Sequence, residues 1–165
     1  MKVAHAAHLA RRFAGSLRPG GPSPAEEAWV AGVLGHDELS LWRRMSGADR
    51  RHAVAVAHRV EELLGAGPVA RPVVAAALLH DVGKVVAGLG TAGRVAATLA
   101  GMAGRRSVTP RVGLYLRHDA LGAELLRAAG SDPLTVAWAA EHHLPPERWT
   151  VPAAIGRALK DADDD

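Results

Sequence analysis

The chain has 165 residues, no cysteine, and a formal charge of +3 from 20 basic and 17 acidic residues. The missing cysteines exclude disulfides, thiolate metal sites and cysteine nucleophiles, so any bound metal must be held by histidine and carboxylate groups. Hydrophobic residues make up 48% of the chain and aromatic residues only 4%, which excludes wholesale disorder and disfavours a stacking platform for single-stranded nucleic acid.

The 34 alanines and the helical spacing of apolar residues predict an all-α protein. A helix over residues 3–17 precedes a Pro/Gly-rich stretch, so we expect an N-terminal appendage and linker over residues 1–22 and one helical domain over residues 23–165. Ser23 is expected to cap a segment that is interrupted near Gly35, and Asp49 to cap the next helix. Further helices are predicted over residues 50–64, from 72 into His80-Asp81, 84–103, 111–118, 120–129, 133–143 and from 152 onwards.

Charge and hydropathy indicate a cytoplasmic protein without a membrane partner. The 17 arginines are scattered in pairs rather than gathered in one block, which is typical of solvated helix faces and disfavours a nucleic-acid surface. The longest apolar run, Val73 to Leu79, is far shorter than the ~20 residues that span a bilayer. The first residues also lack the apolar core of a signal peptide.

Histidine residues on apolar helix faces are the feature that points to chemistry. A polar residue that faces a core needs a partner, and a single such histidine is usually a core residue bonded to a backbone carbonyl. Several of them on different helices can instead converge on one cation, and mixed imidazole and carboxylate ligands favour Mn, Fe, Co, Ni or Zn over Mg. The residues placed in this way are His52, His80 with Asp81, His118, His142 and His143.

These residues lie in short segments with a distinctive order: RHAVAVA at 51–57, ALLHDVGK at 77–84, HDALGAELL at 118–126, AEHHLPP at 140–146 and a late carboxylate. The set resembles the HD superfamily of metal-dependent phosphohydrolases. The third and fourth segments are similar to elements of its HD-GYP branch. The resemblance covers the chain from about Arg50 onwards and implies an all-α, HD-type domain.

Two departures limit what the resemblance to the HD-GYP branch implies. The stretch LPPERWTVPAAIG lacks the Gly-Tyr-Pro loop with which that branch reads its cyclic dinucleotide, so specificity for that nucleotide is not implied. The branch also has an acidic ligand four residues before the first histidine, where this chain has Ala48, with Asp49 one position out of register.

The resemblance implies a role for each matched residue. His52, His80, Asp81 and a C-terminal aspartate would hold the first divalent metal, with Asp81 able to bridge to a second metal held by His118, His142 and His143. Asp81 and Lys84 are the predicted catalytic residues. Lys84 is either a phosphate-binding residue or a solvated surface lysine. Further phosphate-binding candidates are Arg111, Arg117 and Arg148.

Helix phase selects the C-terminal aspartate among four neighbours. Counted from Ile155 at 100° per residue, Asp163 falls at about 80°, close to the apolar stripe, whereas Asp161 falls at about 240°. Ala162-Asp163 also resembles the terminal motif of the family. We therefore expect Asp163 to close the metal site, the alternative being a solvated acidic tail.

The sequence therefore predicts a phosphohydrolase or phosphodiesterase with one or two divalent metals. Its substrate would be a phosphorylated small molecule, with a nucleotide as the first expectation. One alternative is a non-catalytic HD module that binds metal or nucleotide as a sensor or docks a partner. The other is an arginine-rich helical protein that binds nucleic acid.

Overall fold

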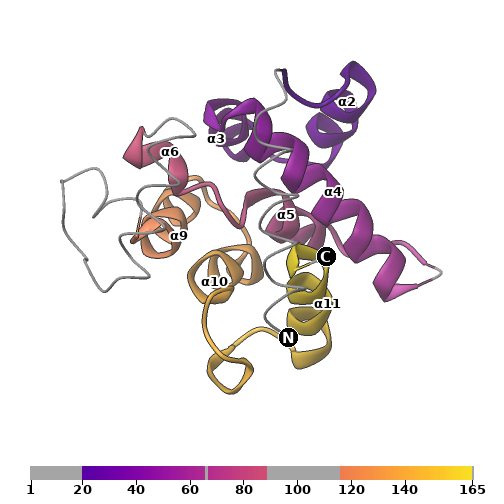
Figure 1. Cartoon of the computed structure of the whole chain (residues 1–165), viewed down its shortest axis with the longest axis vertical. Coiled ribbons are helices and arrows are strands. Elements are labelled where there is room, and N and C mark those ends of the chain that lie inside the picture. Colours follow the sequence, from indigo (N-terminus) through magenta and orange to yellow (C-terminus); the bar gives the residue numbers. More distant parts are fainter. Residues whose placement is uncertain (1–19, 66, 89–115, 165) are drawn as a thin grey trace, which may run out of the picture.

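All regular structure in the described residues, 20–65, 67–88 and 116–164 of the computed structural model, is helical, which confirms the predicted all-α fold (Figure 1). The elements are α2 (Pro24–Val33), α3 (His36–Arg44), α4 (Gly47–Leu64), α5 (Arg71–Leu79), α6 (Lys84–Ala87), α9 (His118–Ala128), α10 (Pro133–Glu141), the 3-10 turn η1 (Pro146–Arg148) and α11 (Ala153–Asp164). Among these helices, none is long and apolar enough to cross a membrane.

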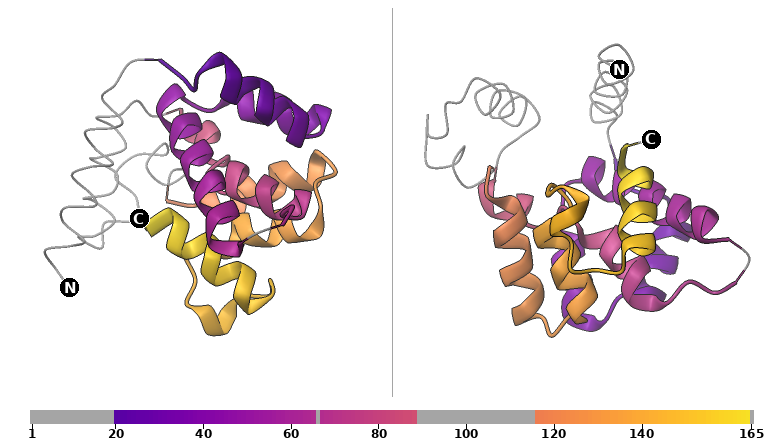
Figure 2. Two further views of the ribbon diagram at one scale, coloured as in Figure 1. Left: turned by 90° about the vertical axis from the view of Figure 1, so that its right-hand side faces the viewer. Right: turned by 90° about the horizontal axis from the view of Figure 1, so that it is seen from below.

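Helix α5 forms the centre of the bundle. Every residue from Val73 to Leu79 is buried, because α5 is surrounded by other helices rather than lying on one side of the core. It packs against α4 and α10, and α2 and α3 also contact it. Helix α9 packs on α10, and α11 packs on α4. The turned views in Figure 2 show these C-terminal helices, in orange to yellow, packed against the rest of the bundle.

Local signals set most of the helix ends. Ser23 and Glu26 form a reciprocal capping box at the start of α2, as Ser23 was expected to do. Gly35 separates α2 from α3. Asp132 caps α10 through its hydrogen bond from the amide of Leu134. Gly65 ends α4 with φ +86, a conformation that disfavours any side chain.

An ion pair between a buried carboxylate and a half-exposed arginine joins α3 to α5. Glu38 accepts hydrogen bonds from the amide of Gly35 and from the guanidinium of Arg71, which also donates to the carbonyl of Val33. Glu38 is almost fully buried. The pair therefore satisfies the end of α2, the start of α3 and the first turn of α5 together.

Three predictions about helix ends are wrong. Ser46, not Asp49, caps α4: the Ser46 hydroxyl accepts a hydrogen bond from the amide of Asp49, which lies in the first turn of the helix. Helix α6 does not continue through Gly88, whose φ of +57 ends it after four residues. His118 begins α9 rather than ending a helix, because residues 116–117 form a turn.

In the helix predicted over residues 50–64, the apolar spacing matches the buried face in the middle and not at the end. Val56 and Val60 are buried, whereas Leu63 and Leu64 are exposed. The predicted helix over 3–17 and the rest of the helices predicted over 84–103 and 111–118 lie outside the described residues, so the division of the chain at residue 22 stays a prediction.

Candidate metal centre

The structure brings all seven predicted metal ligands to one region, where five helix segments meet. His52 lies in the second turn of α4, and Asp163 lies in the last turn of α11. His80 ends α5 and is followed directly by Asp81 in the turn to α6. The remaining three are the first residue of α9, His118, and the two residues that follow α10, His142 and His143.

A close backbone contact holds the turn after α5 against the start of α9. A Cβ atom on Gly83 would overlap the carbonyl oxygen of His118 and lie 2.6 Å from the amide nitrogen of Gly122. Only glycine therefore allows α9 to approach the His80-Asp81 turn this closely. The sequence does not predict this contact, although Gly122 lies inside a predicted helix, where a glycine is a signal of close packing.

Four of the residues form the group that we call the mixed group: His52, His80, Asp81 and Asp163. The Nε2 atom of His52 lies 2.9 Å from Oδ1 of Asp163. The Nε2 atom of His80 lies 3.4 Å from Oδ2 of Asp81 and 3.7 Å from Oδ1 of Asp163. Two imidazoles and two carboxylates thus point at one another from three helices and a turn.

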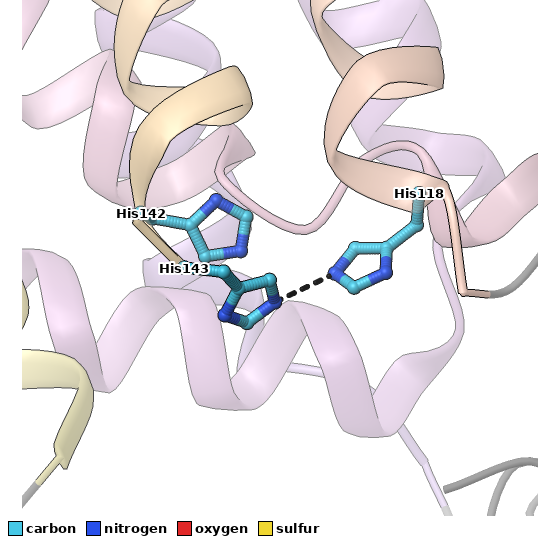
Figure 3. Close-up of side chains that lie close together, drawn as sticks. All are labelled: His118, His142 and His143. Carbon is cyan, nitrogen blue, oxygen red and sulfur yellow. Dashed lines mark hydrogen bonds between the residues drawn. The ribbon is translucent and has the colours of Figure 1, made fainter. Parts of the chain in front are cut away.

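The other three residues form the histidine group, which consists of His118, His142 and His143 (Figure 3). One ring nitrogen from each lies within 4.8 Å of one from each of the others. The Nε2 atoms of His143 and His118 face each other at 3.2 Å, so one of them must carry a proton for that contact to be a hydrogen bond. A cation would bring the two lone pairs together without that requirement.

Asp81 belongs to the mixed group and also faces the histidine group. Its Oδ2 atom faces His80 and accepts a hydrogen bond from the ammonium group of Lys84. Its Oδ1 atom lies 3.3 Å from Nε2 of His118 and 3.9 Å from Nε2 of His142. One carboxylate therefore offers one oxygen to each group, which is the geometry of a bridging ligand.

The donor atoms fit a divalent metal. His80 donates from Nδ1 to the carbonyl of Ala77, and His142 donates from Nδ1 to the carbonyl of Ala139. These bonds assign the proton to Nδ1 and leave the lone pair of Nε2 facing the centre of the cluster. Both Nε2 atoms are buried and have no hydrogen-bond partner, and metal-binding histidines are commonly oriented in this way by a backbone carbonyl.

The electrostatics of the two groups differ. Burial lowers the pKa of His80, but the carboxylates of Asp81 and Asp163 outweigh it and raise that pKa above its ordinary value. Burial favours the neutral form of Asp81, yet Lys84 and His80 hold its pKa well below its ordinary value. Burial and the neighbouring imidazoles of His80 and His143 lower the pKa of His142 strongly.

The structure also separates the C-terminal aspartates. Asp163 is buried, whereas Asp161 and Asp164 are exposed, so the phase of α11 turns only Asp163 of these three towards the cluster. Asp165 lies outside the described residues. That Asp163 binds metal stays a prediction.

The other candidates lie in different positions. Lys84 contacts Asp81 at the cluster and is largely buried, so it is not a solvated surface lysine. Arg117 and Arg148 are exposed, the first directly before α9 and the second in η1. Arg111 lies outside the described residues.

Comparison with known proteins gives one match. A model of the HD domain matches residues 49–164, which is more than half of the chain and includes every residue of both groups. No curated protein and no solved structure matches the chain.

Proposed function

Since the chain belongs to the HD domain family, we propose that it is a metal-dependent phosphohydrolase or phosphodiesterase acting on a phosphate ester, with nucleotides as the first substrate class. The observation that carries the proposal is the pair of buried Nε2 atoms of His80 and His142, which have no hydrogen-bond partner and face different oxygens of the Asp81 carboxylate. In a purely structural cluster the lone pair of His142, whose pKa is lowered, would face the Asp81 carboxylate at a cost in stability.

The mixed group and the histidine group would each hold one divalent ion, with Asp81 shared. Neutral imidazole with carboxylate suits Mn, Fe, Co, Ni or Zn, whereas Mg prefers oxygen ligands and water. Such an ion supplies Lewis acidity for water and for phosphoryl oxygens.

The chain's own residues supply the rest of the site. Lys84 holds a positive charge beside Asp81, where an ammonium group can orient an incoming phosphate oxygen. His143 is exposed and the side chain of His52 is 25% exposed, so each group has a solvent-facing edge that a substrate can reach. The buried bonds from His80 to Ala77 and from His142 to Ala139 keep those rings fixed while substrate binds.

The experiment is a phosphate-release assay on protein loaded with Mn, first with bis-p-nitrophenyl phosphate and then with mono-, di- and cyclic nucleotides. We expect turnover that EDTA abolishes and that His52→Ala removes. His58→Ala is the matched control, because His58 lies on the same helix but is exposed and bonded to Glu61. A metal-loaded chain that hydrolyses none of these substrates would contradict the proposal and favour the sensor or docking module.

A further inference from the structure

A buried carboxylate closes the loop that follows the paired histidines. We propose that Glu141 and Thr150, which we call the clamp, are positioning residues that hold His143 in the histidine group. The inference rests on the proposed function, since it concerns a metal that this group would bind.

The clamp uses both oxygens of one side chain. Oε2 of Glu141 accepts a hydrogen bond of 2.7 Å from the amide of Thr150, and Oε1 accepts one of 2.6 Å from the Thr150 hydroxyl. Glu141 is only 8% exposed and directly precedes His142. Hydrogen bonds to a charged acceptor are shorter and stronger than neutral ones, so the two ends of the loop are firmly joined.

Further contacts within the loop extend the clamp to α11. The indole of Trp149 donates to the carbonyl of Leu144 at 3.0 Å. The same indole lies so close to Gly156 of α11 that a Cβ there would be 2.6 Å from the ring. The loop therefore joins the histidine pair to α11, the helix that carries Asp163. It is held at one end by the clamp and at the other by the contact of Trp149 with Gly156.

The two histidines depend on this path to different degrees. His142 is tied to α10 through the bond from Nδ1 to Ala139. His143 lies beyond the end of α10 and is exposed, and the hydrogen bond that the structure gives its ring is the contact with His118. The amide of Leu144, its neighbour, donates to the carbonyl of Glu141 at 2.7 Å. The position of His143 is therefore set by how the loop leaves the helix, which is what the clamp fixes.

The test is a titration of the full-length chain with Co²⁺, followed by visible absorbance and calorimetry. Thr150→Val keeps the shape of the side chain and removes one hydrogen bond, and Thr150→Ser restores the hydroxyl. His118→Ala and His52→Ala identify the transitions of the histidine group and of the mixed group. We expect Thr150→Val to lower the Co²⁺ affinity of the histidine group, the transition that His118→Ala removes. The loss should be about tenfold, the lower end of the effect of residues that orient ligands. The other transition should not change, and Thr150→Ser should bind as the wild type does.

Two results would overturn the inference. Equal affinities in wild type and Thr150→Val would show that the clamp does not position His143. Equal weakening of both transitions would show a general structural role instead. If the wild-type chain bound no Co²⁺ at all, the proposed function would fail first and the inference with it, so the two failures are distinguishable.

Discussion

The mixed group and the histidine group differ in how they balance charge. In the mixed group the carboxylates of Asp81 and Asp163 face His52 and His80, so a proton on an imidazole is stabilised there. In the histidine group three imidazoles face one another, and the nearby negative charge comes from Oδ1 of Asp81. If both groups bind metal as proposed, the mixed group could exchange its metal for a proton, whereas the histidine group would depend on Asp81 for negative charge.

Removing the shared carboxylate should have the largest effect. Asp81→Asn keeps the size of the side chain but removes the charge that both groups use. Because residues that only orient ligands already contribute about 10–100-fold to metal affinity, we expect a loss of more than about 100-fold at both groups. Calorimetric titration with Mn²⁺ or Co²⁺ measures it, with Asp161→Asn as the exposed control. If one group kept its affinity, Asp81 would not be shared.

Disturbing the backbone contact between the turn after α5 and the start of α9 should have the next largest effect. Gly83→Ala places a methyl group against the backbone of α9, which cannot rotate away, so we expect a loss of about 3 kcal/mol in the free energy of unfolding. Gly83 has φ −62, so the cost is steric rather than conformational. The control is Gly32→Ala in α2, where a Cβ meets nothing within 4 Å. This substitution should raise the free energy of unfolding by about 0.5–1 kcal/mol. Denaturant unfolding measures both changes. If Gly83→Ala raised the free energy of unfolding as Gly32→Ala does, the close contact would be contradicted.

Changing the mixed group alone should have a smaller effect, confined to that group. Asp163→Ala should lower metal affinity and hydrolysis, because it removes the carboxylate beside His52, whereas Asp161→Ala should change little. Metal titration and the phosphatase assay measure both. The reverse pattern would show that the phase of α11 is not what orients the ligand.

The smallest effect is a difference in pH dependence. Protons compete with metal for imidazole, so affinity should fall as pH drops through the histidine range. Because the pKa of His80 is raised, the metal affinity of the mixed group should start to fall early as the pH is lowered, before the pH reaches about 6.5, the ordinary histidine value. The lowered pKa of His142 should let the histidine group keep its metal to lower pH. His118→Ala and His52→Ala, titrated from about pH 8 to 5, isolate each group. Loss in the opposite order would contradict the assigned charge balance.

Local signals in the sequence were enough for much of the fold. Ser23 caps α2 as expected, because its side chain accepts a hydrogen bond from a backbone amide nearby in the chain. The burial of Asp163 followed from the phase of one helix. Asp49 was misread because a serine three residues earlier competes for the same role, and only the path of the chain shows which one caps. The start of α9 at His118 carries no side-chain cap, so no sequence signal marked it.

The arrangement of the site could not be read in the same way. The resemblance to the HD superfamily named the residues and divided them into two groups that share Asp81, but the contacts that bring these distant segments together are specified by no local pattern. The approach of Gly83 to Gly122 sets the distance from Asp81 to His118, and no local pattern specifies it. The clamp between Glu141 and Thr150 was missed because a buried acid next to two histidines gives no sign of its partner nine residues later.

The metal-to-chain ratio of the purified protein tests whether the cluster binds metal at all. The purified chain is incubated with Mn, Fe, Co, Ni and Zn in turn, desalted, and measured by elemental analysis beside His80→Ala. We expect at least one transition metal per wild-type chain and the loss of most of it in the variant, because the buried Nε2 atom of His80 has no hydrogen-bond partner and faces the carboxylates of the mixed group. A wild-type chain that stays metal-free with all five ions would contradict it.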